Sequence, residues 1–315
     1  MANFINDTVF KKTLYNYTLG CYNDSANMQG LFLAPIVRTP TVAGYIQTYS
    51  DIDAFQTVDT SRQPGQSARV VTFKGTPVAY NMTPNALDCP IDQALIDMDD
   101  QESAMIHYET NTKYLVSVAH NTLEQTIWNQ ASASVSLTTG YGSGWSAATG
   151  SQSTTANPIN EVEELYYTIA SDIGVAPNRM ICGSDAWRYM KQAFTTKGMW
   201  PNYMNNDAQL KDYYSNIGQG IQIKVAFAGY SQNPGQATRT ITPFLGKKEI
   251  WLFYASENPT LLDRSAFKTL QYGTGLSNLR TYKTQDQRTT MLALDWYVDA
   301  AKFTNPYAVK RILVT

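Results

Sequence analysis

The longest regular pattern of apolar positions runs from residue 97 to residue 131. Apolar side chains recur there at spacings of three, four or seven residues, at Met105, Tyr108, Leu115, Ala119, Leu123 and Ile127. This spacing is the period of one face of an α-helix. The segment predicts a rod about 50 Å long, whereas most helices of globular proteins have only about a dozen residues. We therefore interpret residues 97–131 as a structural spine.

An extended polar hairpin is predicted before this helix. Val42–Tyr49 and Val70–Phe73 are rich in β-branched and aromatic residues, and residues 59–67 between them have turn chemistry. A lone two-stranded hairpin cannot bury a core, so we expect this one to lie on a neighbouring subunit. The residues expected to make that contact are Arg62, Gln63, Pro64, Gly65 and Gln66.

A second, α/β unit is predicted to begin at Asn157-Pro158, where asparagine suits the N-cap and proline the first helical position. A helix to Ile173, a buried strand over 179–182 and a further helix after Gly183 follow, and then strands near 221–228 and 248–255. Strand patterns return at 289–300 and 307–314. The first unit is therefore expected to be discontinuous, with the second inserted between its helix and its sheet.

Composition favours a protein that makes wide contacts with other proteins. Charged residues are 16% of the chain, uncharged polar residues are abundant, and there are 21 tyrosines. The net charge is −2, the pI is about 5.7 and the basic residues are scattered, which argues against a tight grip on phosphate backbones. No signal peptide and no apolar run near 18 residues are present, so we expect no membrane contact.

Candidate chemistry is sparse, and we expect no catalytic residue, no cofactor and no metal. Asp97, Asp99, Asp100 and Glu102 suit the positive end of the helix dipole better than a metal. His107 and His120 would lie about 20 Å apart along the rod. Cys182 falls in a predicted buried strand, where a thiol is inert. The Gly-rich stretch 140–144 matches no phosphate-binding motif, and we interpret it as a turn.

The sequence from residue 145 to 190 resembles a recurrent stretch of tailed-bacteriophage major capsid proteins with the HK97-type fold. The matching residues are Trp145, Asn157-Pro158-Ile159, Glu161, Ile173-Gly174, Pro177-Asn178 and Cys182-Gly183-Ser184-Asp185-Ala186-Trp187. The resemblance implies an α+β, HK97-like capsid fold. It would comprise an N-terminal arm (1–40), an extended hairpin loop with its lead-in (41–96), a peripheral-domain spine helix and connector (97–156), an axial domain (157–280) and returning peripheral strands (281–315).

The resemblance further implies a non-enzymatic shell subunit that assembles with itself into hexamers and pentamers. Such a shell would form in the bacterial host cytoplasm, become part of the virion and touch packaged double-stranded DNA weakly and non-specifically. Scaffolding, portal and decoration proteins are the other expected partners. The chain shows no charged helical scaffolding segment, so scaffolding would be a separate protein or the mature chain starts here. Lys74 is the lysine that could be proposed for covalent crosslinking, but no matching acid and asparagine can be assigned.

Three other functions stay open from the sequence. An encapsulin-type nanocompartment would share the fold and enclose a cargo enzyme, but its cargo groove is lined by an N-terminal helix, and the arm here is weakly helical. A hydrolytic or carbohydrate-active enzyme would need convergent polar residues in a pocket. Another phage structural protein, such as a tail component, is the third alternative.

Overall fold

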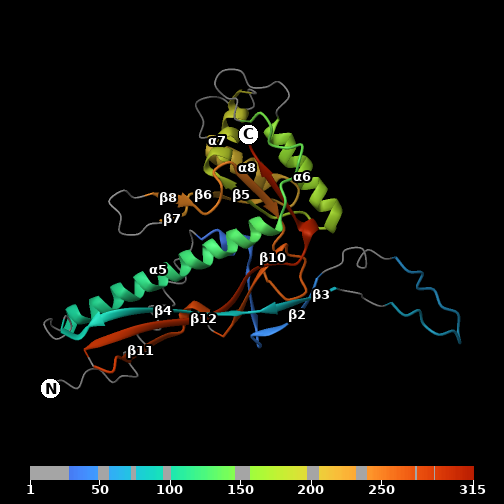
Figure 1. Cartoon of the computed structure of the whole chain (residues 1–315). Helices are drawn as coiled ribbons and strands as arrows, with labels where there is room; N and C mark the ends of the chain where they lie inside the picture. The colour runs from blue at the N-terminus through green and yellow to red at the C-terminus, as the bar shows by residue number, and fades with distance from the viewer. Residues whose placement is uncertain are drawn as a thin grey trace.

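One long helix and two sheets organise the chain (Figure 1). The computed structural model describes residues 28–48, 57–71, 76–94, 101–145, 157–196, 206–231, 240–273, 275–286 and 288–315. The mixture of helices and sheets confirms the predicted α+β class. The C-terminus lies at the sheet nearer the top of Figure 1, and a long hairpin leaves the body of the molecule on the right.

The spine helix α5 extends over Gln101–Ser134 and confirms the long helix predicted from the apolar spacing. Its 34 residues make a rod about 51 Å long. The helix ends three residues later than predicted, because the Arg311 guanidinium donates to the carbonyl oxygens of Ser132 and Val135 at 3.0 and 3.2 Å. The buried face contains Leu115, Val116, Ala119, Leu123, Ile127, Trp128 and Ala131.

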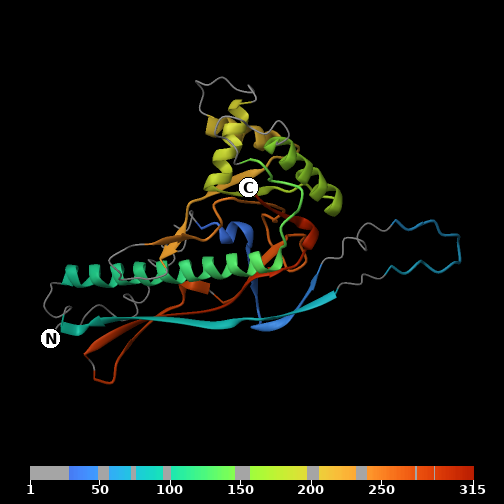
Figure 2. The same cartoon turned by 45° about the horizontal axis from the view of Figure 1, so that its top comes forward.

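The first sheet has five strands and lies along α5 (Figures 1 and 2). Its central strand, β12, spans Thr289–Phe303 and pairs with β4, β10 and β11. Alternate residues of β12, such as Leu292 and Leu294, are buried toward the helix. The other strands are β1 (Ile36–Thr39), β4 (Thr83–Asp92), β10 (Phe267–Tyr272) and β11 (Leu279–Lys283), and the short 3-10 helix η2 (Gly275–Ser277) precedes β11.

The second sheet has the order β13-β9-β5-β6 and is accompanied by three helices. Its core is nearly continuous in apolar residues, as expected for strands covered on both faces: Met180, Ile181 and Cys182 are fully buried, and so are Ile250 and Trp251. The elements are α6 (Pro158–Ile173), β5 (Arg179–Gly183), α7 (Ser184–Thr196), α8 (Asn206–Asn216), β6 (Gln222–Ala226), β9 (Glu249–Phe253), the 3-10 helix η3 (Pro306–Ala308) and β13 (Val309–Leu313). A small β7–β8 hairpin (Gly229–Ser231 and Ile241–Pro243) projects from it.

Two strands belong to the opposite sheet from the one predicted. The segment 157–280 was expected to form one unit, but β10 within it pairs with β1 and β12 of the first sheet. Residues 281–315 were all expected to return to the first sheet, but β13 pairs with β9 of the second. The physical reason is that a strand's apolar alternation specifies its buried face and not its hydrogen-bonding partner. The chain therefore passes between the two sheets more often than a single insertion requires.

The extended hairpin is shorter in its paired part than the segment 41–96. Strands β2 (Ala43–Thr48) and β3 (Thr76–Asn81) form a two-stranded ladder, and β4 then enters the five-stranded sheet. No strand is assigned within the described tip, residues 57–71, although Val70 and Val71 were expected to be part of one.

The start of α6 confirms the predicted N-cap position and Pro158 at the first helical position. Asn157 does occupy the N-cap position, but its side chain makes no capping hydrogen bond; its backbone carbonyl oxygen accepts from the Glu161 N–H at 3.0 Å. The predicted end is confirmed, since Gly174 adopts the left-handed conformation with φ of 66°.

Candidate assembly surfaces

The tip of the extended hairpin is the most exposed described part of the chain. Residues 59–71 are all exposed, and this set contains every residue predicted for intersubunit contact. The Gln66 N–H donates to the Gln63 carbonyl oxygen at 3.1 Å and closes the turn, in which Gly65 has φ of 91°. An added Cβ on Gly65 would meet no atom within 4 Å. The structure therefore brings the predicted tip residues together in open solvent, and no partner chain is present that would test their contact role.

Two apolar side chains of the tip also lie in solvent. Val70 is 87% exposed and Val71 is 63% exposed. Neither was included in the predicted contact set, although the β-branched run to which they belong was visible in the sequence. Two adjacent exposed valines on a projecting loop favour a surface that another chain covers.

The base of the hairpin is anchored while the tip is not. Ile46 and Tyr80 on the ladder pack with Val37, Met82 and Leu270 in a small separate core. The Tyr80 hydroxyl lies 2.9 Å from the Thr41 hydroxyl. The hairpin is thus held firmly where it leaves the body, and its far end has no core of its own.

The face of the five-stranded sheet opposite α5 is open and polar. Tyr272, Tyr282 and Tyr297 are 41, 47 and 38% exposed, and the rings of Tyr272 and Tyr297 meet edge to face at 6.1 Å. The Tyr282 hydroxyl donates to Asp88 at 2.8 Å, and this bond raises the pKa of the tyrosine. Exposed tyrosines are enriched at protein–protein interfaces.

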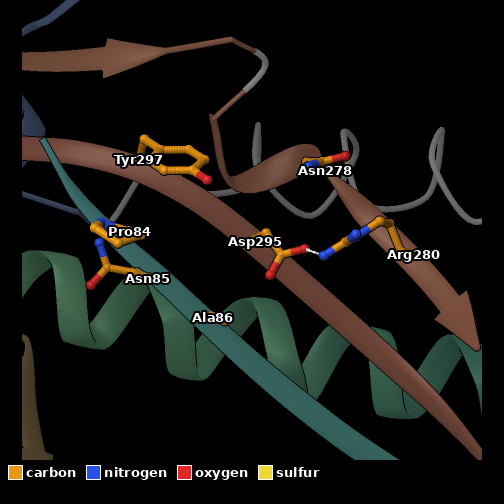
Figure 3. Close-up of a pocket in the computed structure, with 7 residues that line it drawn as sticks. All are labelled: Pro84, Asn85, Ala86, Asn278, Arg280, Asp295 and Tyr297. Carbon is orange, nitrogen blue, oxygen red and sulfur yellow. Dashed lines mark hydrogen bonds and ion pairs between the residues drawn. The ribbon is translucent and has the colours of Figure 1, made fainter. Parts of the chain in front are cut away.

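A shallow hollow lies on this open face (Figure 3). Arg280 on β11 and Asp295 on β12 point toward one another and form an ion pair, and Tyr297 lies further along β12. The hollow is lined by Pro84, Asn85, Ala86, Asn278, Arg280, Asp295 and Tyr297. Its lining mixes polar and apolar residues and includes the Arg280–Asp295 ion pair.

The residues that carry the sequence resemblance are structural. The Glu161 carboxylate accepts from the Gly142 N–H at 2.7 Å and from the Trp145 indole at 3.1 Å, and so fixes the Gly-rich connector on α6. The Asn178 side chain pairs with the backbone of Ala255 through two hydrogen bonds of 2.8 and 3.0 Å. These contacts join the motif residues to the connector before α6 and to the segment after β9.

Glycine at position 183 is required by a close approach. An added Cβ there would lie 2.4 Å from the carbonyl oxygens of Gly246 and Lys247. The Lys247 carbonyl oxygen accepts from the N–H groups of Asp185 and Ala186 at the start of α7. The Trp187 indole then donates to Asp207 on α8 at 2.5 Å.

Sequence reasoning missed a buried carboxylate, Glu124, beneath the segment of residues 28–34, which we call the strap. The strap contains the short helix α2 (Gly30–Leu33) and crosses from α5 to the edge of β6. Gln29 donates through its side chain to the Val225 carbonyl oxygen, and Arg179 donates to the Phe32 carbonyl oxygen. A signal was present in the sequence, since Glu124 adjoins Leu123 and lies one helical turn before Trp128, on the apolar stripe.

The other candidate residues do not converge on a site. His120 is buried, which lowers its pKa to about 4, and Cys182 is fully buried, which raises its pKa. Asp97, Asp99, Asp100 and Lys74 lie outside the described residues, as does the side chain of Glu102. Within the described ranges, no three His, Cys, Asp or Glu side chains are grouped so that they could hold a metal ion. No helix in the described part of the chain is both long and apolar enough to cross a membrane.

Comparison with known proteins identifies the fold. No model of a known protein family matches the sequence, and no curated protein sequence does. Among solved structures, a phage-related protein from Bordetella bronchiseptica RB50 is similar over 96% of both chains, with 18% identity and a TM-score of 0.67. A capsid protein assigned to a prophage of E. coli CFT073 is similar over 94% of this chain and 98% of its own, with 11% identity and a TM-score of 0.51.

An encapsulin shares the same architecture. The SrpI encapsulin of Synechococcus elongatus PCC 7942 is similar over 92% of this chain and 89% of its own, with 12% identity and a TM-score of 0.52. At these identities the common feature is the fold. The chain has a fold found in shell-forming proteins, namely the HK97-like capsid fold that its sequence motif predicted.

Proposed function

We propose that the protein is the structural major capsid subunit of a bacteriophage, which assembles with itself into hexamers and pentamers of an icosahedral shell. The observation that carries this proposal is the projecting hairpin, whose tip is fully exposed and bears two solvent-facing valines on an HK97-like fold. A protein that acts alone gains nothing from such a loop, whereas a shell subunit uses it to lie on its neighbour. Many weak polar contacts of this kind add up in a closed assembly.

The proposal includes a division of labour along the chain. The N-terminal arm (1–40) would end in β1, which joins the five-stranded sheet. The hairpin would be the extended loop, and α5 with the five-stranded sheet would form the peripheral domain. The second sheet with α6, α7 and α8 would form the axial domain that meets its copies at hexamer and pentamer centres. In this proposal β10 and β13 are assigned by their pairing rather than by their position in the chain.

The remaining partners follow from the same proposal. The shell would enclose double-stranded DNA and touch it weakly, because the net charge is −2 and the basic residues are scattered. Scaffolding, portal and decoration proteins would contact it during assembly in the host cytoplasm and in the virion. The subunit would carry out no catalysis, and the polar contacts of its motif residues, such as Glu161 with Trp145, serve packing.

An encapsulin-type nanocompartment is the second candidate, because the encapsulin and the prophage capsid protein are about equally similar to this chain. The greater similarity of the phage-related protein, with a TM-score of 0.67, favours the virus. Shells of the two kinds differ in content, since a capsid encloses nucleic acid and a nanocompartment encloses protein cargo.

Negative-stain electron microscopy of the purified protein, with size-exclusion chromatography, tests the shell. Closed particles or hexameric sheets are expected, and the ultraviolet absorbance ratio of the particles distinguishes nucleic acid from protein cargo.

A matched pair of variants tests the hairpin. Deletion of residues 61–67 is expected to leave soluble subunits that form no complete shells. Replacement of the same residues by a Gly-Ser repeat of equal length keeps the length of the hairpin and removes its side chains, so it shows which of the two assembly requires. Normal particles from the deletion variant would refute the assignment of the hairpin to intersubunit contact.

A further inference from the structure

Glu124 holds the strap through one of its two carboxylate oxygens. The backbone N–H groups of Gln29 and Gly30 donate to Oε1 at 3.0 and 2.7 Å, and the Trp128 indole donates to the same atom at 2.9 Å. The first two donors are backbone groups at the start of α2, which have no partner within that helix. Oε1 is thus fully occupied when the strap is docked.

The second oxygen of Glu124 is enclosed without a hydrogen bond from the described residues. Glu124 is only 2% exposed, and its Oε2 has no partner among them. Gly30 lies directly against it, since a Cβ built on Gly30 would be 2.7 Å from Oε2 and 3.1 Å from Cγ2 of Ile127. A carboxylate in this position keeps half of its charge in apolar surroundings, which costs more free energy than burial of the neutral acid.

We propose that Glu124 is a charge-controlled latch: the strap docks most firmly while the Glu124 carboxyl group is neutral and loosens when the group ionises. The strap lies over Glu124, so release of residues 28–34 returns the carboxylate to water. The neutral acid keeps a carbonyl oxygen for the three donors and removes the enclosed charge. The latch therefore controls whether residues 28–34 stay fixed on the spine helix.

One cation acts on Glu124 from a neighbouring element, namely Lys224 on β6, and Arg179 on β5 acts on Lys224 in turn. His120 lies one turn earlier on α5, and the strap itself has no charged residue. Burial raises the pKa of Glu124 and outweighs the opposing effects of its hydrogen bonds and of Lys224. A raised pKa in the docked state means that docking is strongest below the ordinary pKa and weakens as the pH rises through the docked value. His120 acts in the opposite direction, because burial lowers its pKa to about 4.

Hydrogen exchange measured by mass spectrometry tests the latch on the full chain. Peptides that cover residues 28–34 are followed from about pH 4 to about pH 8, where carboxyl groups and histidines titrate, with correction for intrinsic exchange. The chains compared are the wild type, Glu124→Gln, Glu124→Ala and the control Glu109→Gln. The control makes the same chemical change on the same helix, about 22 Å from Glu124 along the helix axis.

The expected result is a severalfold loss of strap protection with rising pH in the wild type and in Glu109→Gln, relative to Glu124→Gln. The His120 contribution is common to these chains and cancels in that comparison. Glu124→Gln is expected to keep the strap protected, because the amide oxygen still accepts, and Glu124→Ala is expected to lose protection at every pH. Identical pH profiles in the wild type and Glu124→Gln would overturn the proposal, as would a strap left unprotected at every pH in Glu124→Gln.

Discussion

Arg311 and Glu249 form a two-point ion pair across neighbouring strands of the second sheet. The arginine Nε and one terminal nitrogen each lie 3.0 Å from a different carboxylate oxygen of Glu249. The other terminal nitrogen donates to carbonyl oxygens at the end of the spine helix, and the guanidinium lies 5.1 Å from the centre of the Trp251 ring. One side chain thus joins two strands of the second sheet, β13 and β9, to the end of α5.

We predict that Arg311→Ala lowers the free energy of unfolding by about 2–4 kcal/mol, because it leaves Glu249 and the helix carbonyl groups without their shared donor. Arg311→Lys is expected to recover only part of this loss, since an ammonium group cannot make the two-point contact. The control is Arg188→Ala: Arg188 is largely exposed, its nearest contact with Asp185 is 4.0 Å, and a change below about 0.5 kcal/mol is expected. Urea denaturation measures the free energy of unfolding of the three variants. Equal losses for Arg311→Ala and Arg188→Ala would contradict the proposal that Arg311 joins the strands to the helix.

Substitution of two glycines in the Gly-rich connector distinguishes the cost of backbone strain from the cost of a steric clash. Gly140 and Gly142 both have positive φ, at 92 and 80°. An added Cβ on Gly140 would meet nothing within 4 Å, whereas one on Gly142 would lie 2.5 Å from the Leu313 carbonyl oxygen. We predict a loss of about 1 kcal/mol for Gly140→Ala and at least about 1 kcal/mol more for Gly142→Ala. Denaturation midpoints measure the stability of the two variants. Equal losses would show that the connector moves away from Leu313 and avoids the clash.

The exposed valines of the hairpin provide a test of assembly without a change in folding. We predict that the double variant Val70→Asp, Val71→Asp unfolds within about 0.5 kcal/mol of the wild type, because neither side chain is buried. The same variant is expected to form few or no closed particles in electron micrographs. Leu262→Asp is the control, since Leu262 is also 63% exposed but belongs to the segment between β9 and β10 and not to the hairpin tip. Loss of closed particles in Leu262→Asp alone would indicate that the intersubunit contact lies near Leu262 and not at the hairpin tip.

His120 is expected to make stability depend on pH. It is 4% exposed, and burial lowers its pKa from 6.5 to about 4. For a base whose pKa is lowered by folding, the stabilising contribution is complete above the ordinary pKa and is lost as the pH falls toward the folded value. We predict that this contribution decreases by roughly 2–3 kcal/mol between about pH 7 and pH 4.

The difference between the wild type and His120→Gln isolates the histidine, because Glu124 titrates in both chains. Urea denaturation at several pH values gives the two profiles. Parallel pH profiles of the free energy of unfolding in the two chains would mean that His120 accepts a proton in its buried site without a loss of stability.

The sequence by itself determined the elements whose signal is local. The apolar period along residues 105–127 predicted α5, Pro158 and Gly174 marked the two ends of α6, and Pro64-Gly65 marked the hairpin turn. The capsid-type motif also indicated the HK97-like fold, through its resemblance to a recurrent stretch of proteins with that fold. For the helices and the turn, the information lies within a few residues, where helix period, caps and turn residues act.

Only the tertiary structure decided which strands pair and which polar side chains are buried. The apolar alternation of β13 does not distinguish β9 from β12 as a partner, and the pairing with β9 places Arg311 beside Glu249. Glu124 appears as one more polar residue on a long helix until the strap, more than 90 positions earlier, closes over it. Pairing and burial depend on long-range contacts whose free energies are summed over the whole fold, so short-range patterns could not reveal them.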